Sequence, residues 1–153
     1  MVEENKRLIQ KYYHDMWNAW NFSVAEEIIH EAIDFRGSLG MTTQGREGFK
    51  GYMKTIRAAF PDFHNQIEDL IAEGEKVVAR LTYTGTHQGT VFNVAATGKT
   101  IRYSGMAIFQ LEAGQVLRGW VLGDTLGLLQ QLGAVASFSW VDHSSCPGKA
   151  IVS

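Results

Sequence analysis

Cysteine is almost absent from this 153-residue sequence, in which Cys146 is the only one. A single cysteine can form neither an internal disulfide nor a thiolate metal site. The 14 basic residues do not exceed the 16 acidic ones, so no positive surplus exists to neutralise phosphates, and no nucleic-acid partner is expected. No run of about 18 uncharged apolar residues occurs, and no membrane-spanning helix is therefore expected.

Histidine is present but is poorly spaced for a metal site. The histidines at 14, 30, 64, 87 and 143 give no HxH or HxxxH pattern, so no metal ligand set is predicted. The first ten residues, MVEENKRLIQ, lack the apolar stretch of a signal peptide, which favours a cytoplasmic location. The composition, 45% hydrophobic and 20% charged, is that of an ordinary globular protein. We expect one domain over residues 1–134 and a tail over 135–153.

The first half of the chain has the periodicity of helices. Apolar residues recur at helical spacing over 3–20 and 46–60. Between them, Ser23 and Glu26 form a capping-box pattern that predicts a short helix ending near His30. Residues 33–39 read as extended chain and 41–45 as a loop. Pro61 should end the helix before it, because the residue preceding a proline avoids helical geometry.

After Pro61 the period changes from 3.6 to 2, which is typical of strands. Strands are predicted at 63–72, 76–88, 99–111 and 115–123, with Gly74 and Gly114 supplying the tight turns. A last helix is predicted at 125–132, ending at Gly133. Helices separated in this way from a bent antiparallel sheet indicate an α+β fold of two layers. In the tail, Phe138 and Trp140 alternate with serine, so a short strand and a frayed end are both open.

Several short motifs occur in an order that matches a known family. They are GREGF at 45–49, FPDFH at 60–64, GTHQG at 85–89, ATGK at 96–99, WVLGD at 120–124 and GLLQQLG at 127–133. Over residues 5–134 the chain resembles the SnoaL-like polyketide cyclases, or ester cyclases. These belong to the cone-shaped superfamily of ketosteroid isomerase and nuclear transport factor 2, and the resemblance implies a cone-shaped α+β barrel.

The resemblance also implies a function. Members of the family close a ring on a polyketide ester by intramolecular aldol condensation, with no metal or organic cofactor. Their general acid/base is an aspartate just before the final helix, and the matching residue here is Asp124. The resemblance further implies a small hydrophobic or polycyclic ligand and a homodimer. Ala96, Gln110 and Arg118 depart from the family pattern, which leaves the substrate and any second catalytic group open.

The residues themselves allow two interpretations of Asp124. It shares a strand face with Trp120 and Leu122, and an apolar setting of that kind raises the pKa of a carboxyl group by desolvation. Asp124 also directly precedes a predicted helix, where it could simply be the N-cap.

Two further residues are candidates for a catalytic role. The His87 imidazole could orient a carbonyl group or share a proton, or it could be a loop histidine bonded to the backbone. Arg80 lies in mid-strand, where it faces either the solvent or an anionic intermediate.

The substrate-binding candidates come from strands and helices. Gln110 and Met106 share one strand face, and Gln110 could donate a hydrogen bond to an enolate oxygen or be a polar surface residue. Six aromatic residues could line a pocket for a flat polycyclic ligand or form plain core: Tyr12, Trp17, Trp20, Phe35, Tyr52 and Phe60. The substrate-binding candidates that we single out are Gln110, Met106, Trp120, His64, Tyr12, Trp17, Phe35 and Tyr52.

Three functions fit these residues. The first is a cofactor-independent cyclase with Asp124 as acid/base. The second is an epoxide hydrolase or dehydratase on the same cone, which would need an Asp–Arg–Asp or Asp–His arrangement involving Arg80 or His87. The third is a non-catalytic ligand-binding or dimerisation module, since fold does not fix function. A solvent-exposed, helix-capping Asp124 would favour the third.

Overall fold

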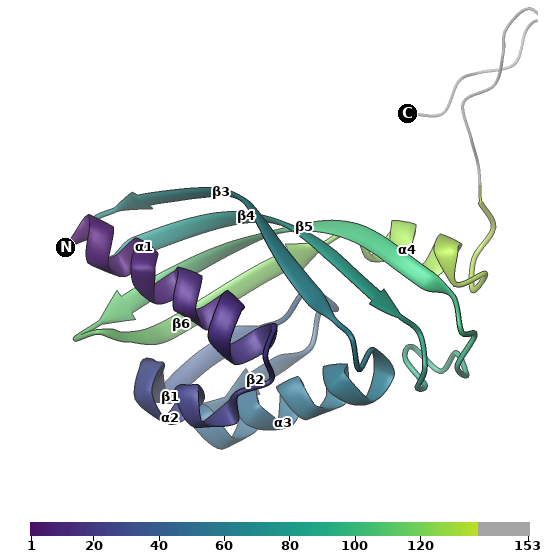
Figure 1. The fold of residues 1–153 in the computed structure, drawn as a ribbon, viewed down its shortest axis with the longest axis horizontal. Helices are drawn as coiled ribbons and strands as arrows, with labels where there is room; N and C mark the ends of the chain where they lie inside the picture. Colours follow the sequence, from purple (N-terminus) through teal and green to yellow (C-terminus); the bar gives the residue numbers. More distant parts are fainter. Residues whose placement is uncertain (138–153) are drawn as a thin grey trace, which may run out of the picture.

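The computed structural model describes residues 1–137, so the predictions for Phe138, Trp140 and Cys146 lie outside the described residues. It has two layers, with helices against one side of a bent sheet of six strands (Figure 1). This confirms the predicted α+β class, although the sheet is open and not a closed barrel. Within residues 1–137, none of the helices has the length and apolar character needed to cross a lipid bilayer.

The N-terminal helix changes its winding halfway along. Helix α1 (Val2–Lys11) continues as a π-helical segment, η1 (Tyr12–Trp17), in which the N–H of Asn18 donates to the carbonyl of Tyr13. Within the π segment Tyr12, Tyr13, Met16 and Trp17 are all buried in the core, whereas His14 and Asp15 are exposed. The prediction of a helix at 3–20 is confirmed, but it ends three residues early and its π segment was not foreseen.

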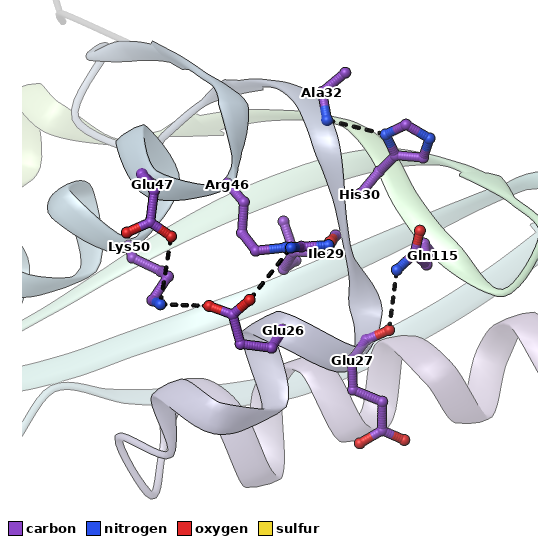
Figure 2. Close-up of polar contacts among 9 residues, drawn as sticks. All are labelled: Glu26, Glu27, Ile29, His30, Ala32, Arg46, Glu47, Lys50 and Gln115. Atoms are coloured by element: carbon purple, nitrogen blue, oxygen red, sulfur yellow. Dashed lines mark hydrogen bonds and ion pairs between the residues drawn. The ribbon is translucent and has the colours of Figure 1, made fainter.

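The second helix begins and ends earlier than the sequence indicated. In α2 (Phe22–Ile28) the N-cap is Asn21, which accepts a hydrogen bond from the N–H of Ser23, so the predicted Ser23–Glu26 capping box is wrong. Glu26 instead bonds to Arg46 and Lys50 across the gap to the next helix (Figure 2). Strand β1 (Ile29–Arg36) follows at once, because the alternation of buried Ile29, Ile33 and Phe35 suits a strand.

The third helix starts from a short strand that the sequence analysis read as a loop. Strand β2 (Thr42–Gln44) pairs antiparallel with β1, and α3 (Gly45–Ala59) begins directly after it. The helix lies under the sheet and buries Phe49, Tyr52, Met53 and Ile56. It ends before Pro61, as predicted.

Four long strands form the rest of the sheet, close to their predicted positions. They are β3 (His64–Glu73), β4 (Lys76–Thr86), β5 (Thr100–Glu112) and β6 (Gln115–Gly123), and the order across the sheet is β2-β1-β6-β5-β4-β3. Among the strands of residues 1–137, only β1 and β6 pair in parallel. Along β5, buried and exposed side chains alternate almost without exception, so each strand has an inner face toward the helices and an outer face.

The last helix, α4 (Thr125–Gln131), lies at one end of the sheet (Figure 1). The Gln131 side-chain amide bonds to both the N–H and the carbonyl of Arg102 on β5, which fixes the helix to the strand. This confirms the predicted helix at 125–132.

Candidate functional site

The inner face of the sheet and the helices enclose a small hollow whose lining is mostly aromatic. Its volume is about 20 Å³, which is room for roughly one water molecule. Of the six aromatic residues predicted to line a pocket, Tyr12, Trp17, Phe35 and Tyr52 border this hollow, whereas Trp20 and Phe60 do not. The sequence analysis missed the other seven lining residues: Tyr13, Ser38, Ile56, Phe63, Asn65, Tyr83 and Val121.

Polar groups inside this apolar shell are hydroxyls and amides. The hydroxyls of Ser38 and Tyr103 lie 3.0 Å apart, and the Tyr52 ring packs so closely over Gly37 that a side chain there would overlap its hydroxyl. Asn65 is held by the side chain of Asn18. No acidic or basic side chain is among the lining residues that the structure describes. The hollow therefore offers neutral hydrogen-bond donors and no carboxylate.

Burial keeps the tyrosine hydroxyls protonated. It raises the pKa of Tyr52 from 10.0 to about 12, although hydrogen bonds with Ser38 and the nearby backbone lower it in part. Burial raises the pKa of Tyr12, Tyr13, Tyr83 and Tyr103 even further. All five tyrosines are therefore neutral donors at physiological pH.

These raised pKa values predict alkaline unfolding. Below about pH 10 tyrosine is protonated in the folded and the unfolded protein alike, so this contribution to stability is fully present. As pH rises above 10 the unfolded chain releases protons that the folded chain retains, and stability falls. In a pH titration, tyrosinate is measured by absorbance at 295 nm. It should appear only at the pH values at which circular dichroism shows that the protein unfolds. Tyrosinate appearing in a still-folded protein would contradict this burial.

Asp124 lies outside the hollow. It is exposed and is the N-cap of α4, with Oδ1 accepting from the N–H of Gly127 at 2.9 Å. On β6 it follows the parity of Trp120 and Leu122, which are exposed, whereas Val121 is buried and lines the hollow. The structure thus has the capping geometry that the sequence left as an alternative, and this is the observation that favours a non-catalytic ligand-binding or dimerisation module over catalysis by Asp124.

Asp124, Arg80 and Met106 meet in a different place, a groove on the outer face of the sheet. Its volume is about 410 Å³, and Leu122 and Ser104 also line it. Arg80 is half-exposed there and its Nε is 2.6 Å from a carboxylate oxygen of Asp69. Three of the predicted site residues therefore lie together, but on the outer surface and not in the interior.

His87 belongs to neither place. Its side chain is fully buried beside the Phe60 ring, and its Nδ1 accepts a hydrogen bond from the N–H of Thr97 at 3.2 Å. Its Nε2 has no hydrogen-bond partner among the described residues. The backbone N–H of His87 also donates a hydrogen bond to the Lys99 carbonyl. Through this bond and the Thr97 contact, His87 holds the loop between β4 and β5 in place.

The remaining predicted binding residues are scattered over the surface. His64 is exposed at the start of β3, and Gln110 is half-buried on β5. Trp120 is exposed on the outer face, with the Arg36 guanidinium 5.4 Å from its ring centroid. None of these three side chains lines the hollow.

A comparison with models of known protein families found one that covers most of the chain. The family model for SnoaL-like polyketide cyclase matches residues 7–132. The chain belongs to this family. The resemblance seen in the sequence is thereby confirmed. No curated protein matches the sequence.

Solved structures of the same shape include proteins of this family. A candidate polyketide cyclase from Bacillus cereus ATCC 10987 is 31% identical, with 87% of this chain and 83% of that chain covered and a TM-score of 0.72. A candidate SnoaL-like polyketide cyclase from Jannaschia sp. CCS1 is 20% identical, with 88% and 94% covered and a TM-score of 0.81. AclR from Streptomyces galilaeus, a candidate hydroxylase, is 24% identical, with 91% and 87% covered and a TM-score of 0.79.

Proposed function

We propose that this SnoaL-like protein closes rings on small hydrophobic polyketide-type compounds in the cytoplasm, by intramolecular aldol condensation and without a cofactor. Family membership supports the reaction class. The observation that carries the proposal is the set of neutral hydroxyls inside an aromatic hollow, with Tyr52 and Ser38 at its wall. Such a place suits a flat carbonyl compound, because the rings cover its faces and the hydroxyls meet its oxygens.

The chemistry needs a donor for the oxygen that becomes negative. In a chain of alternating carbonyl groups, an enol carbon attacks a carbonyl carbon further along and a carbon–carbon bond forms. The attacked carbonyl oxygen takes up a proton, and the enol gives one up as it returns to a ketone, so no net acid or base is consumed. Fixed O–H groups in a dry site stabilise the developing oxyanion strongly. The enclosing rings hold the chain folded on itself, which supplies proximity.

The hollow must enlarge to take such a ligand. Its volume of about 20 Å³ is far below the roughly 300–1,000 Å³ of typical small-molecule sites. Binding therefore requires lining side chains such as Trp17 to rotate away from the centre, and the ligand replaces their contacts with its own.

The direct test is ring closure of a linear 3,5,7-trioxo ester, in which C2 can attack the C7 carbonyl to form a six-membered ring. We expect the full chain to accelerate formation of the cyclic product above the rate in buffer, followed by absorbance and mass spectrometry. The proposal is wrong if, across a series of such esters, the rate with the protein equals the rate in buffer and no saturable binding is seen.

A second candidate is acid/base chemistry in the outer groove, with Asp124 as the base. It is favoured by the way Asp124, Arg80 and Met106 line one groove, with Arg80 already held by Asp69. That arrangement also approaches the Asp–Arg–Asp set of an epoxide hydrolase. Against it, Asp124 is exposed and already caps α4.

Asp124→Asn separates the two candidates. Asparagine caps a helix about as well as aspartate, so the fold should be unchanged while the base is lost. If the hollow is the site, the ring-closure rate should stay within about twofold of wild type. If Asp124 is the general base, the rate should fall by about 10²–10⁴-fold. Hydrolysis of small cyclic epoxides by the wild type and by Asp124→Asn should be measured in the same way, because the groove also approaches the residue set of an epoxide hydrolase.

A further inference from the structure

Asn65 places an amide group in the wall of the hollow. It lies near the start of β3, the last strand of the sheet, and pairs with Tyr83 on β4. Its side chain is 3% exposed, and it is the only amide among the lining residues that the structure describes. The proposed ring closure gives this amide no role. A polar group buried among aromatic rings costs free energy unless it is hydrogen-bonded, so its partners matter.

Asn18 fixes the orientation of the Asn65 amide. Oδ1 of Asn18 accepts from the backbone N–H of Asn65 at 2.8 Å, and Nδ2 of Asn18 donates to the Asn65 carbonyl at 3.0 Å. These two bonds allow Asn18 one orientation, because a flipped amide would set donor against donor and acceptor against acceptor. The same Oδ1 lies 3.0 Å from Nδ2 of Asn65. The nitrogen of the Asn65 amide is therefore turned toward Asn18, and its oxygen is turned away.

The Oδ1 atom of Asn65 is a free acceptor. Within residues 1–137 the hydrogen bonds of Asn65 use its backbone and its Nδ2, and none of them uses Oδ1. An amide oxygen can only accept a hydrogen bond, whereas a neutral tyrosine or serine hydroxyl can also donate one. A buried acceptor without a donor is unfavourable. A ligand that brings an O–H group to this atom removes that cost.

The hydroxyl donors lie on the far side of the hollow from Asn65. Asn65, Tyr83 and Tyr103 pair with one another across β3, β4 and β5, and neighbouring strands are about 4.8 Å apart, so Asn65 and Tyr103 are separated by about 10 Å. The Ser38 hydroxyl is 3.0 Å from that of Tyr103, and Ser38 and Tyr52 both line the hollow. The hollow therefore has an acceptor at its β3 end and donors at the opposite end.

We propose that Asn65 selects ligands that carry a hydroxyl group, enolic or phenolic, at the end opposite to the carbonyl group that Tyr52 and Ser38 receive. This selection rests on the function proposed above, which places the ligand in the hollow. The ligand O–H donates to Oδ1 of Asn65, and Asn18 is the positioning residue that holds this oxygen in place. The substrate class is thereby narrowed to polyketide-type compounds with a free, protonated hydroxyl group at the remote end.

Three ligands with the same two-ring skeleton test this selection: 6-hydroxy-1-tetralone, 6-methoxy-1-tetralone and 1-tetralone. All three have the carbonyl group, and only the first has a hydroxyl group at the remote end. Dissociation constants for the full chain are measured by isothermal titration calorimetry under mildly acidic conditions, which keep the phenol protonated. We expect the wild type to bind the hydroxy compound about tenfold more tightly than the other two, because only this compound satisfies the buried acceptor.

Asn65→Leu removes the acceptor at nearly constant side-chain size. The backbone N–H and carbonyl of residue 65 can still bond to Asn18, so β3 should keep its place. The matched control is Gln66→Leu, which replaces an exposed amide on the opposite face of the same strand. We expect Asn65→Leu to bind 6-hydroxy-1-tetralone and 1-tetralone equally well, and Gln66→Leu to keep the tenfold preference.

Asn18→Ala tests the positioning role, and it should reduce the preference because the Asn65 amide is then free to turn. A merely structural role of the two asparagines would weaken all three ligands alike and leave the ratio of dissociation constants unchanged, which would overturn the proposal. A wild-type ratio near one, or no saturable binding of the tetralones, would also overturn it.

Ring closure of the trioxo ester is measured separately, so that the two proposals can fail independently. A protein that shows the hydroxyl preference, loses it in Asn65→Leu and closes no ring supports the selection by Asn65 and refutes the proposed function. A protein that closes rings without the preference refutes the selection alone.

Discussion

Replacing Tyr52 by phenylalanine is expected to slow ring closure about 10²–10³-fold, the usual effect of removing one oxyanion donor. Tyr52 lines the hollow, and its pKa of about 12 keeps the hydroxyl proton in place as a donor. The loss should appear in kcat more than in KM, because the bond strengthens as charge develops on the substrate oxygen. Single-turnover kinetics with the trioxo ester would measure it.

Tyr103→Phe is the matched control for this variant. Tyr103 is also buried and its hydroxyl contacts the same Ser38, but it does not line the hollow. Its loss should lower stability by about 1 kcal/mol and change the rate much less than the loss of the Tyr52 hydroxyl. Equal losses of rate in the two variants would mean that the hydroxyl network acts only through the fold.

Replacing Gly89 by alanine should reduce the free energy of unfolding by about 2–3 kcal/mol. Gly89 lies against the end of α3, where its N–H and that of Gln88 donate to the Ala59 carbonyl. A Cβ there would overlap the carbonyl oxygen of Ala58, which is backbone and cannot rotate aside. The loop between β4 and β5, which His87 holds in place, would therefore be displaced from α3. Urea unfolding followed by circular dichroism measures the change.

Gly51→Ala provides the opposite case in the same neighbourhood. Gly51 lies within α3, and a Cβ there would have no neighbour within 4 Å. Alanine should stabilise the helix by roughly 0.5–1 kcal/mol. If Gly89→Ala were as well tolerated as Gly51→Ala, the close contact between this loop and α3 would be refuted.

Most of the fold could be predicted from the sequence because its periodicity is strong. The alternation on β5 and the helical spacing in α3 each follow from one buried face, and Pro61 separates the two regimes. The short β2 was missed because its three residues, Thr42–Gln44, have no period of their own and are strand only through pairing with β1. The π segment was missed because the spacing of Tyr12, Tyr13, Met16 and Trp17 fits one face of an α-helix equally well.

The candidate site could be predicted only in part. The lining residues Tyr12, Trp17 and Tyr52 follow from helical faces, and Tyr83 could have been found from its parity with Ala79 and Leu81 on β4. Ser38 could not, since it lies after β1 with no pattern to aim it inward. For Asp124 the parity was correct, but one strand alone does not say which of its two faces is inside.

The most direct measurement of the central claim is a crystal structure of the full chain with a non-cyclising polyketide analogue. The account predicts the analogue between the sheet and the helices, with Trp17 displaced and one carbonyl oxygen within hydrogen-bond distance of the Tyr52 hydroxyl. An analogue bound beside Asp124 and Arg80 on the outer face, with the interior still closed by its own aromatic rings, would contradict it.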